Sequence, residues 1–221
     1  MSLLPLILGI GGHLDTEGEE TSKFKSHPKL KPEQVLDRDN RTCRFCGFHS
    51  ARYQRVLRHN GEDVTACSFC ELVLHLERAA LMGNAILIWL PEVTQVQLNH
   101  MARAAYIAQE SDDENMRGLA LRMIEALKSR RTDAKRRIGT DDPMLFYTVL
   151  QEGLQSKKRV NIASKIEGIR LFPLDQYLAG SKEVNVFPKM IQFWTSKEGP
   201  FAKLPVAEWT KMFEKFKEEK E

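Results

Sequence analysis

The chain has 221 residues, 42% of them hydrophobic and 29% charged, with 33 lysines and arginines against 30 aspartates and glutamates. These proportions exclude a collagen-like, coiled-coil or wholly disordered chain, and the length allows one or two domains. The net charge of +3 is too small to demand a nucleic acid or a membrane as partner.

Two short apolar stretches occur, at residues 3–10 and 85–90. Both fall far short of the roughly 20 residues that cross a bilayer, so we expect no membrane span. The first stretch contains Pro5, follows no positive residue and is shorter than the apolar region of most secretory signals. We expect it to form a strand or docking segment, followed at residues 11–32 by a polar linker or by a segment that orders on a partner.

Four cysteines form two Cys-x-x-Cys pairs separated by 20 residues, with none left over. They are Cys43, Cys46, Cys67 and Cys70. This spacing is typical of zinc sites, in which Zn²⁺ takes four thiolates in a tetrahedron at about 2.3 Å. Gly47 can adopt the left-handed backbone conformation that closes the first turn. Because sulfur would fill all four positions, we expect a closed structural site without an open position for catalysis.

Other uses of these cysteines fit less well. Two disulfides would require an oxidising compartment, and a thioredoxin-like centre would require a single Cys-x-x-Cys in a βαβ unit. Iron binds the same set of four thiolates, so the sequence leaves zinc and iron open. We therefore predict one structural metal ion, Zn²⁺ or iron.

The segment between the two pairs predicts a β-hairpin. Residues 51–57 alternate as in a strand, Asn60-Gly61 favours a tight turn, and residues 63–66 return as the second strand. The second cysteine pair then lies on the first turn of a helix that we expect to continue through Arg78. A helix N-terminus stabilises thiolates through its dipole and free N–H groups. This order of knuckle, hairpin and helix is that of a treble clef.

Treble clefs of this outline also occur in HNH endonucleases. There a histidine at the end of the first hairpin strand acts as general base, and helix residues hold a second metal. Here His59 follows Arg58 in place of an acidic residue and is expected in the turn, and His75 has no obvious partner on the helix. His49 is not needed as a ligand, because four cysteines suffice. A divergent HNH nuclease therefore stays an alternative that lacks its usual catalytic residues.

Four segments carry a more distinctive pattern. They are Asp-Arg-Asp at 37–39, Cys-Arg-Phe-Cys-Gly-Phe at 43–48, Cys-Ser-Phe-Cys at 67–70 and Ile-Trp-Leu-Pro-Glu-Val-Thr-Gln at 88–95. Together they resemble the IcmJ/DotN family of the Dot/Icm type IVB secretion system. The resemblance is most specific over residues 37–110 and continues through Asp142-Pro143, residues 169–173 and Gln192-Phe193-Trp194.

This resemblance implies a cytoplasmic protein associated with the inner-membrane secretion complex. Family members have an HNH-like zinc core without nuclease chemistry and belong to the coupling complex that gathers effector proteins before secretion. They bind the C-terminal extension of the coupling ATPase (DotL), beside a membrane subunit (DotM) and the IcmS/IcmW adaptor pair. The resemblance also implies that Cys43, Cys46, Cys67 and Cys70 are the metal ligands. The expected role is that of a non-catalytic adaptor.

Downstream of the cysteines, the sequence predicts mostly helices. The expected elements are a buried strand at 85–90, a helix with a Thr94–Gln97 capping box, a helix at 111–139 ended by Gly139, a helix opened by Asp142-Pro143, a short helix at 158–167, an extended segment at 171–173, and helices at 188–195 and 205–216. In the helix opened by Asp142-Pro143, Leu145, Phe146, Val149 and Leu150 are expected on the apolar side.

The predicted fold is therefore α+β and mostly helical, with a treble-clef/HNH-like four-cysteine knuckle and hairpin surrounded by helices. We divide it into an N-terminal segment and linker (1–36), a zinc core with the following strand and helix (37–110) and a helical region packed on that core (111–221).

Basic residues are in local excess over residues 22–60 and 117–137. On the hairpin they include Arg52, Arg55 and Arg58, which could contact phosphates. Three nearby aromatic residues could stack on bases: Phe45, Phe48 and Tyr53. A solvated face, or a surface for an acidic partner protein, explains the same charge. A nucleic-acid-binding zinc module is therefore the other alternative to the adaptor.

Overall fold

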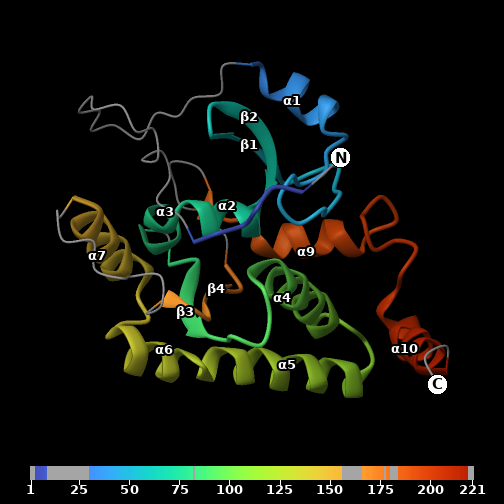
Figure 1. Cartoon of the computed structure of the whole chain (residues 1–221). Helices are drawn as coiled ribbons and strands as arrows, with labels where there is room; N and C mark the ends of the chain where they lie inside the picture. The colour runs from blue at the N-terminus through green and yellow to red at the C-terminus, as the bar shows by residue number, and fades with distance from the viewer. Residues whose placement is uncertain are drawn as a thin grey trace.

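The computed structural model describes residues 3–8, 30–81, 83–155, 166–176, 178–179 and 184–218. Within them the chain is mostly helical, with three two-stranded antiparallel sheets, which confirms the α+β class (Figure 1). Most of the linker predicted at 11–32 and most of the helix predicted at 158–167 lie outside the described residues.

The elements follow the predicted order closely. They are α1 (Pro32–Arg38), β1 (Gln54–His59), β2 (Glu62–Cys67), α2 (Ser68–Leu74), α3 (Leu76–Leu81), β3 (Ala85–Trp89), α4 (Gln95–Gln109), α5 (Glu114–Ser129), α6 (Arg131–Ile138), α7 (Pro143–Gln155), β4 (Ile169–Pro173), β5 (Leu178–Ala179), β6 (Val184–Asn185), α9 (Phe187–Thr195), the 3₁₀ turn η1 (Val206–Glu208) and α10 (Trp209–Glu218).

The hairpin forms around the Asn-Gly turn. Asn60 and Gly61 have φ values of +49° and +81°, the left-handed conformations that a two-residue hairpin turn requires. The register pairs His59 with Glu62 and Gln54 with Cys67, so β1 begins and ends later than predicted. His59 is consequently the last residue of a strand, and its predicted position in the turn is wrong.

A second sheet joins the two halves of the chain. Strand β3 lies where residues 85–90 predicted it and pairs antiparallel with β4, whose residues are about 80 positions further on. Helix α4 packs against β4 and begins at the predicted capping box, in which Thr94 and Gln97 exchange side-chain and backbone hydrogen bonds. Figure 1 shows α4 in the centre of the molecule, between the hairpin and the layer formed by α5 and α6.

Two predicted helices are each divided. The run after the second cysteine pair breaks at His75 (φ −129°, ψ 69°), and the break allows α3 to pack on α7. The helix predicted at 111–139 is interrupted at Arg130, whose carbonyl accepts a hydrogen bond from Trp89 N–H of β3 at 3.3 Å. Gly139, with φ +83°, ends α6 as predicted.

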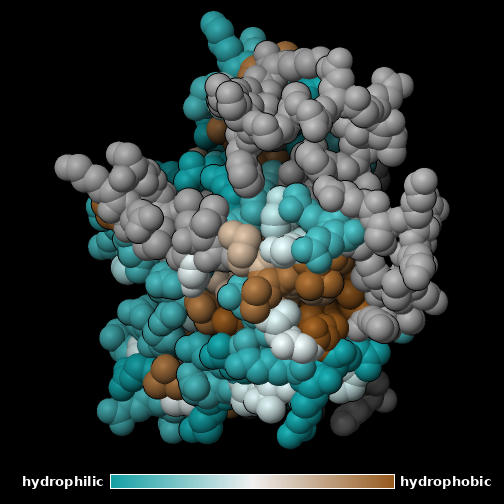
Figure 2. All heavy atoms as spheres, turned by 90° about the vertical axis from the view of Figure 1, so that its left-hand side faces the viewer, coloured by the Kyte–Doolittle hydropathy of each residue, from teal (hydrophilic) through white to brown (hydrophobic). Residues whose placement is uncertain are grey.

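The predicted apolar side of α7 is only half right. Phe146 and Leu150 are buried in the core, whereas Leu145 and Val149 are 58% and 59% exposed. The helix packs on α3 along a stripe too narrow to cover all four side chains. Figure 2 shows hydrophobic side chains gathered on the side of the molecule that carries α7.

Candidate metal centre

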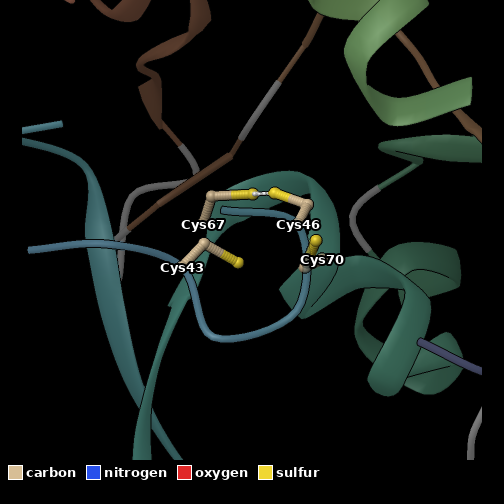
Figure 3. Close-up of side chains that lie close together, drawn as sticks. All are labelled: Cys43, Cys46, Cys67 and Cys70. Carbon is tan, nitrogen blue, oxygen red and sulfur yellow. Dashed lines mark hydrogen bonds between the residues drawn. The ribbon is translucent and has the colours of Figure 1, made fainter. Parts of the chain in front are cut away.

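The four cysteines come together in the core. Their sulfur atoms all lie within 4.8 Å of one another, and no cysteine is more than 5% exposed. Figure 3 shows them converging from the loop before β1, the end of β2 and the first turn of α2. Among the described residues, this is the one group of three or more His, Cys, Asp or Glu side chains placed to hold a metal ion.

Local backbone geometry brings each pair together. Gly47 has φ +73°, and its N–H donates to Cys43 O at 2.9 Å, which closes the first turn as predicted. Cys67 is the residue that caps α2, and Cys70 lies in the first turn of that helix. Arg44 N–H donates to Thr65 O at 2.9 Å and so fixes the first pair against β2, beside the second.

The spacing of the sulfurs fits a tetrahedral metal site. Zinc–sulfur bonds of about 2.3 Å place neighbouring sulfurs about 3.8 Å apart. Cys46 Sγ and Cys67 Sγ lie 3.7 Å apart (Figure 3). The residues present therefore fit the ion that their spacing predicts.

The buried cysteines of the cluster differ in how readily their thiols ionise. Hydrogen bonding with the Cys43 thiol, together with burial, raises the pKa of Cys46 and of Cys70. Hydrogen bonds from the same neighbours, and the positive charge of Arg103, lower the pKa of Cys67. A divalent cation would stabilise all four as thiolates, because thiolates are the form that binds metal.

Helix α4 presents a polar face to the sulfurs. Asn99 Nδ2 donates to Cys70 Sγ and Arg103 Nη2 donates to Cys67 Sγ, each at 3.4 Å. His100 Nε2 lies 2.9 Å from Cys46 O, and Gln95 Nε2 donates to Asn99 Oδ1 at 3.0 Å. Hydrogen bonds of this kind orient thiolate ligands and reduce the cost of burying their charge.

Arg103 is the most unusual member of this face. It is 1% exposed, although arginine is rarely buried to this extent without compensating partners. Its guanidinium carbon lies 3.8 Å from the ring centroid of Phe48, 5.2 Å from that of Phe69 and 5.6 Å from that of Trp194. The side chain therefore connects the cysteine cluster with α9, which carries Trp194.

Sequence reasoning missed these contacts. Leu98, Ala102 and Ala105 of α4 are buried in the core, and no role was assigned from the sequence to the polar residues beside them. Gln95, Asn99 and Arg103 recur every four residues, which places them on one side of a helix. That spacing is the pattern that could have revealed them.

Comparison with known proteins supplies the family. No family model matches the chain. The curated protein "Type 4 apparatus protein DotN" of Legionella pneumophila is 30% identical over 165 residues, covering 68% of this chain and 73% of that protein. The chain belongs to the DotN (IcmJ) family. The resemblance stated from the cysteine and Leu-Pro-Glu-Val-Thr-Gln segments is thereby confirmed.

In this DotN-family protein, the histidines considered for nuclease chemistry lie apart from the cysteine cluster. The ring of His59 packs edge-on against that of Phe45, with centroids 5.1 Å apart, and burial lowers the pKa of His59, with a smaller effect from His75. His75 Nδ1 lies 3.1 Å from Glu77 Oε1. His49 Nδ1 lies 2.9 Å from the carbonyl of Asn40. None of the three joins the four cysteines as a potential ligand among the described residues.

The hairpin arginines all have acidic neighbours. Arg58 Nη1 bonds Asp63 Oδ1 at 2.9 Å, Arg55 lies 3.8 Å from a Glu71 oxygen, and Arg52 lies 3.8 Å from a Glu198 oxygen, a partner that the sequence did not suggest. These contacts reduce the charge that the hairpin offers to a phosphate backbone.

Two of the three aromatic residues considered for stacking on bases are in the core. Phe45 is fully buried and Phe48 is 8% exposed, so neither ring is available to a base. Tyr53 is partly exposed and its ring packs near that of Phe193, with centroids 6.0 Å apart.

The N-terminal segment docks on the cysteine knuckle. Leu4 N–H donates to Arg44 O at 2.7 Å, and Leu4, Leu6 and Leu8 pack on the core. Leu3 and Ile7 alternate with them and are 56% and 67% exposed. The predicted docking role of this stretch is therefore observed over residues 3–8. In the described part of the chain, no helix is long and apolar enough to cross a membrane.

Proposed function

We propose that this protein is a metal-stabilised adaptor subunit of a bacterial type IVB secretion coupling complex. The observation that carries the proposal is its relationship to DotN, a type 4 apparatus protein, across 73% of that protein's length. The buried four-cysteine cluster supports a structural part for the metal, since it leaves no ligand position for a substrate.

In this proposal, Cys43, Cys46, Cys67 and Cys70 are the ligands of one Zn²⁺ ion, with iron as the alternative metal. When bound, the ion supplies a cross-link between the knuckle, β2 and α2. Asn99 and Arg103 orient two of the sulfurs, and Arg103 compensates part of their negative charge. The protein's own chemistry is limited to holding these elements in place for partner proteins.

The partners that we propose come from the family. They are the C-terminal region of a DotL-like coupling ATPase, a DotM-like membrane subunit and IcmS/IcmW-like adaptors, through which effector proteins are recruited. We place the complex on the cytoplasmic side of the inner membrane. The division into an N-terminal segment (1–36), a zinc core (37–110) and a helical region (111–221) stays a prediction within this proposal.

Co-purification tests the adaptor role directly. The tagged protein is expressed together with the C-terminal region of the ATPase from the same organism, and the two are isolated by affinity and size-exclusion chromatography. We expect a stoichiometric complex that persists when the exposed Arg52 and Arg136 are changed to glutamine. Arg52 and Arg136 are chosen because their side chains are exposed, so their replacement should leave the fold intact. Arg58 is not replaced, because it pairs with the buried carboxylate of Asp63.

Three results would each contradict the proposal. One is the absence of any complex with the ATPase region under conditions in which both proteins are folded. The second is steeply salt-dependent binding of DNA or RNA that the Arg52→Gln and Arg136→Gln changes abolish. The third is cleavage of plasmid DNA with Mn²⁺ that His59→Ala abolishes.

A further inference from the structure

A pocket of about 440 Å³ lies between the end of α4 and helix α9. Its size falls within the range of about 300–1,000 Å³ that is usual for ligand pockets. It is lined by Tyr106, Gln109, Glu110, Asp175, Phe187, Pro188, Ile191, Gln192 and Thr195. Figure 1 shows α4 and α9 running next to each other, and they are in contact.

The floor of this pocket is apolar and rigid. Tyr106, Phe187 and Ile191 are each at most 5% exposed. The rings of Tyr106 and Phe187 pack edge to face with centroids 5.1 Å apart, and the Tyr106 hydroxyl donates to Pro173 O at 2.8 Å. A side chain entering here would therefore meet preformed aromatic and aliphatic surface.

The rim is acidic. Glu110 and Asp175 are both exposed, and neither forms an ion pair with any described residue. The described lining contains no lysine or arginine. Helix α4 ends at the pocket and α9 begins there, so the partial negative charge at the end of α4 and the partial positive charge at the start of α9 offset each other. The two carboxylates therefore decide the sign of the local potential. This negative site stands out on a chain whose net charge is +3.

We propose that this pocket binds an arginine or lysine side chain of a partner polypeptide. The aliphatic part of such a side chain would lie on Tyr106, Phe187 and Ile191, and its charged end would meet Glu110 and Asp175. Arginine suits the site best, because its planar guanidinium pairs with carboxylates and stacks on aromatic rings. The inference adds a binding site to the proposed adaptor role. It rests on that role only in taking the basic side chain to come from a partner protein.

A peptide titration tests the pocket by itself. The ¹⁵N-labelled full-length protein is titrated by NMR with three blocked tripeptides that carry arginine, citrulline or glutamate between two leucines. We expect the arginine peptide to shift the amide signals of Gln109, Glu110, Gln192 and Thr195. The neutral citrulline peptide should bind several-fold more weakly, and the glutamate peptide should not bind.

A matched pair of variants assigns the effect to the two carboxylates. Glu110→Gln with Asp175→Asn should weaken binding of the arginine peptide about fivefold to tenfold, as expected for two partly exposed ion pairs. Glu152→Gln with Glu208→Gln removes the same charge from exposed positions outside the pocket and should leave binding unchanged.

The inference would be overturned by no binding of the arginine peptide at millimolar concentration, by equal binding of the arginine and glutamate peptides, or by equal effects of the two double variants. Equal binding of the arginine and citrulline peptides would point to an apolar occupant and would overturn the proposed charge selection. Each result leaves the co-purification with the ATPase unaffected, so failure of the pocket and failure of the adaptor role are distinguishable.

Discussion

Replacement of Arg103 by methionine tests whether α4 stabilises the metal centre. Methionine keeps much of the side-chain volume but removes the donor to Cys67 Sγ and the cation held near Phe48, Phe69 and Trp194. A hydrogen bond to a charged group contributes about 1.5–3 kcal/mol, and a desolvated cation–π contact about 2 kcal/mol. The cost of burying a guanidinium offsets part of that sum.

We therefore expect the zinc-loaded Arg103→Met protein to lose about 2–3 kcal/mol of unfolding free energy, measured by urea denaturation. Its zinc affinity, measured by competition with a chromophoric chelator, should fall about 10- to 100-fold, as is usual when a group that orients metal ligands is removed. Arg103→Lys keeps the charge but loses the planar stack, so its values should be intermediate.

Arg136→Met is the matched control. Arg136 lies on α6 with a side chain 77% exposed, and it pairs only with Asp133 among the described residues, at 3.3 Å. Its replacement should cost less than about 0.5 kcal/mol. The reasoning is refuted if Arg103→Met and Arg136→Met match in stability and in zinc affinity.

Three further predictions follow from the fold. Cys70→Ser should abolish stoichiometric metal binding and unfold the hairpin region, seen as lost protection in hydrogen exchange; native protection without metal would contradict this. Phe146→Ala should cost about 3–4 kcal/mol in urea denaturation, whereas Leu145→Ala should cost less than about 1 kcal/mol; equal costs would refute the assigned orientation of α7. Burial is the largest single influence on the pKa of Asp39 and acts to raise it, but the hydrogen bonds from Arg38 and Thr65 and the positive charge of Arg38 together outweigh it, so the pKa is lowered. The stability from Asp39 is therefore present above its unfolded pKa of about 3.9 and is lost as the pH falls through the lower folded value. Asp39→Asn should be less stable than wild type at pH 7, by about 2 kcal/mol, and this difference should shrink as the pH falls through the folded pKa of Asp39; a difference that does not change with pH would contradict this.

The sequence predicts the parts of this fold that local chemistry determines. The cysteine spacing, the Asn60-Gly61 turn and the Thr94–Gln97 capping box each act over a few residues, and the structure contains all three features. The buried strand at 85–90 could be predicted as a strand for the same reason. The extended segment predicted at 171–173 lies within β4, but its pairing with β3 could not be predicted, because the pairing joins residues that are far apart in the chain.

What the sequence leaves undetermined depends on tertiary contacts. The helix predicted at 111–139 is interrupted at Arg130, where the backbone carbonyl accepts a hydrogen bond from β3. The side of α7 that is buried is determined by its packing on α3. The role of the polar face of α4 can be assigned only from the fold, which places the cysteine sulfurs within hydrogen-bonding distance of it. Helix propensity and hydrophobic periodicity predict a helix in each case. They do not predict which neighbouring element packs on it, and so they do not predict which side stays exposed.

The charged and aromatic residues of the knuckle and the hairpin show the same limit. Arg52, Arg55 and Arg58 form a basic series in the sequence, yet their acidic partners include Glu71 on α2 and Glu198 beyond α9. Phe45 and Phe48 are close to these arginines in the chain but face the core. A nucleic-acid surface could be hypothesised from composition, but only the fold shows how these side chains are used.

The metal content of the native protein tests the central claim most directly. The protein is purified from its own organism or without an affinity metal, and its zinc and iron are measured by inductively coupled plasma mass spectrometry. We predict one zinc ion per chain, lost together with the folded hairpin when the four cysteines are changed to serine. A folded, ATPase-binding protein that contains no stoichiometric metal would contradict the account.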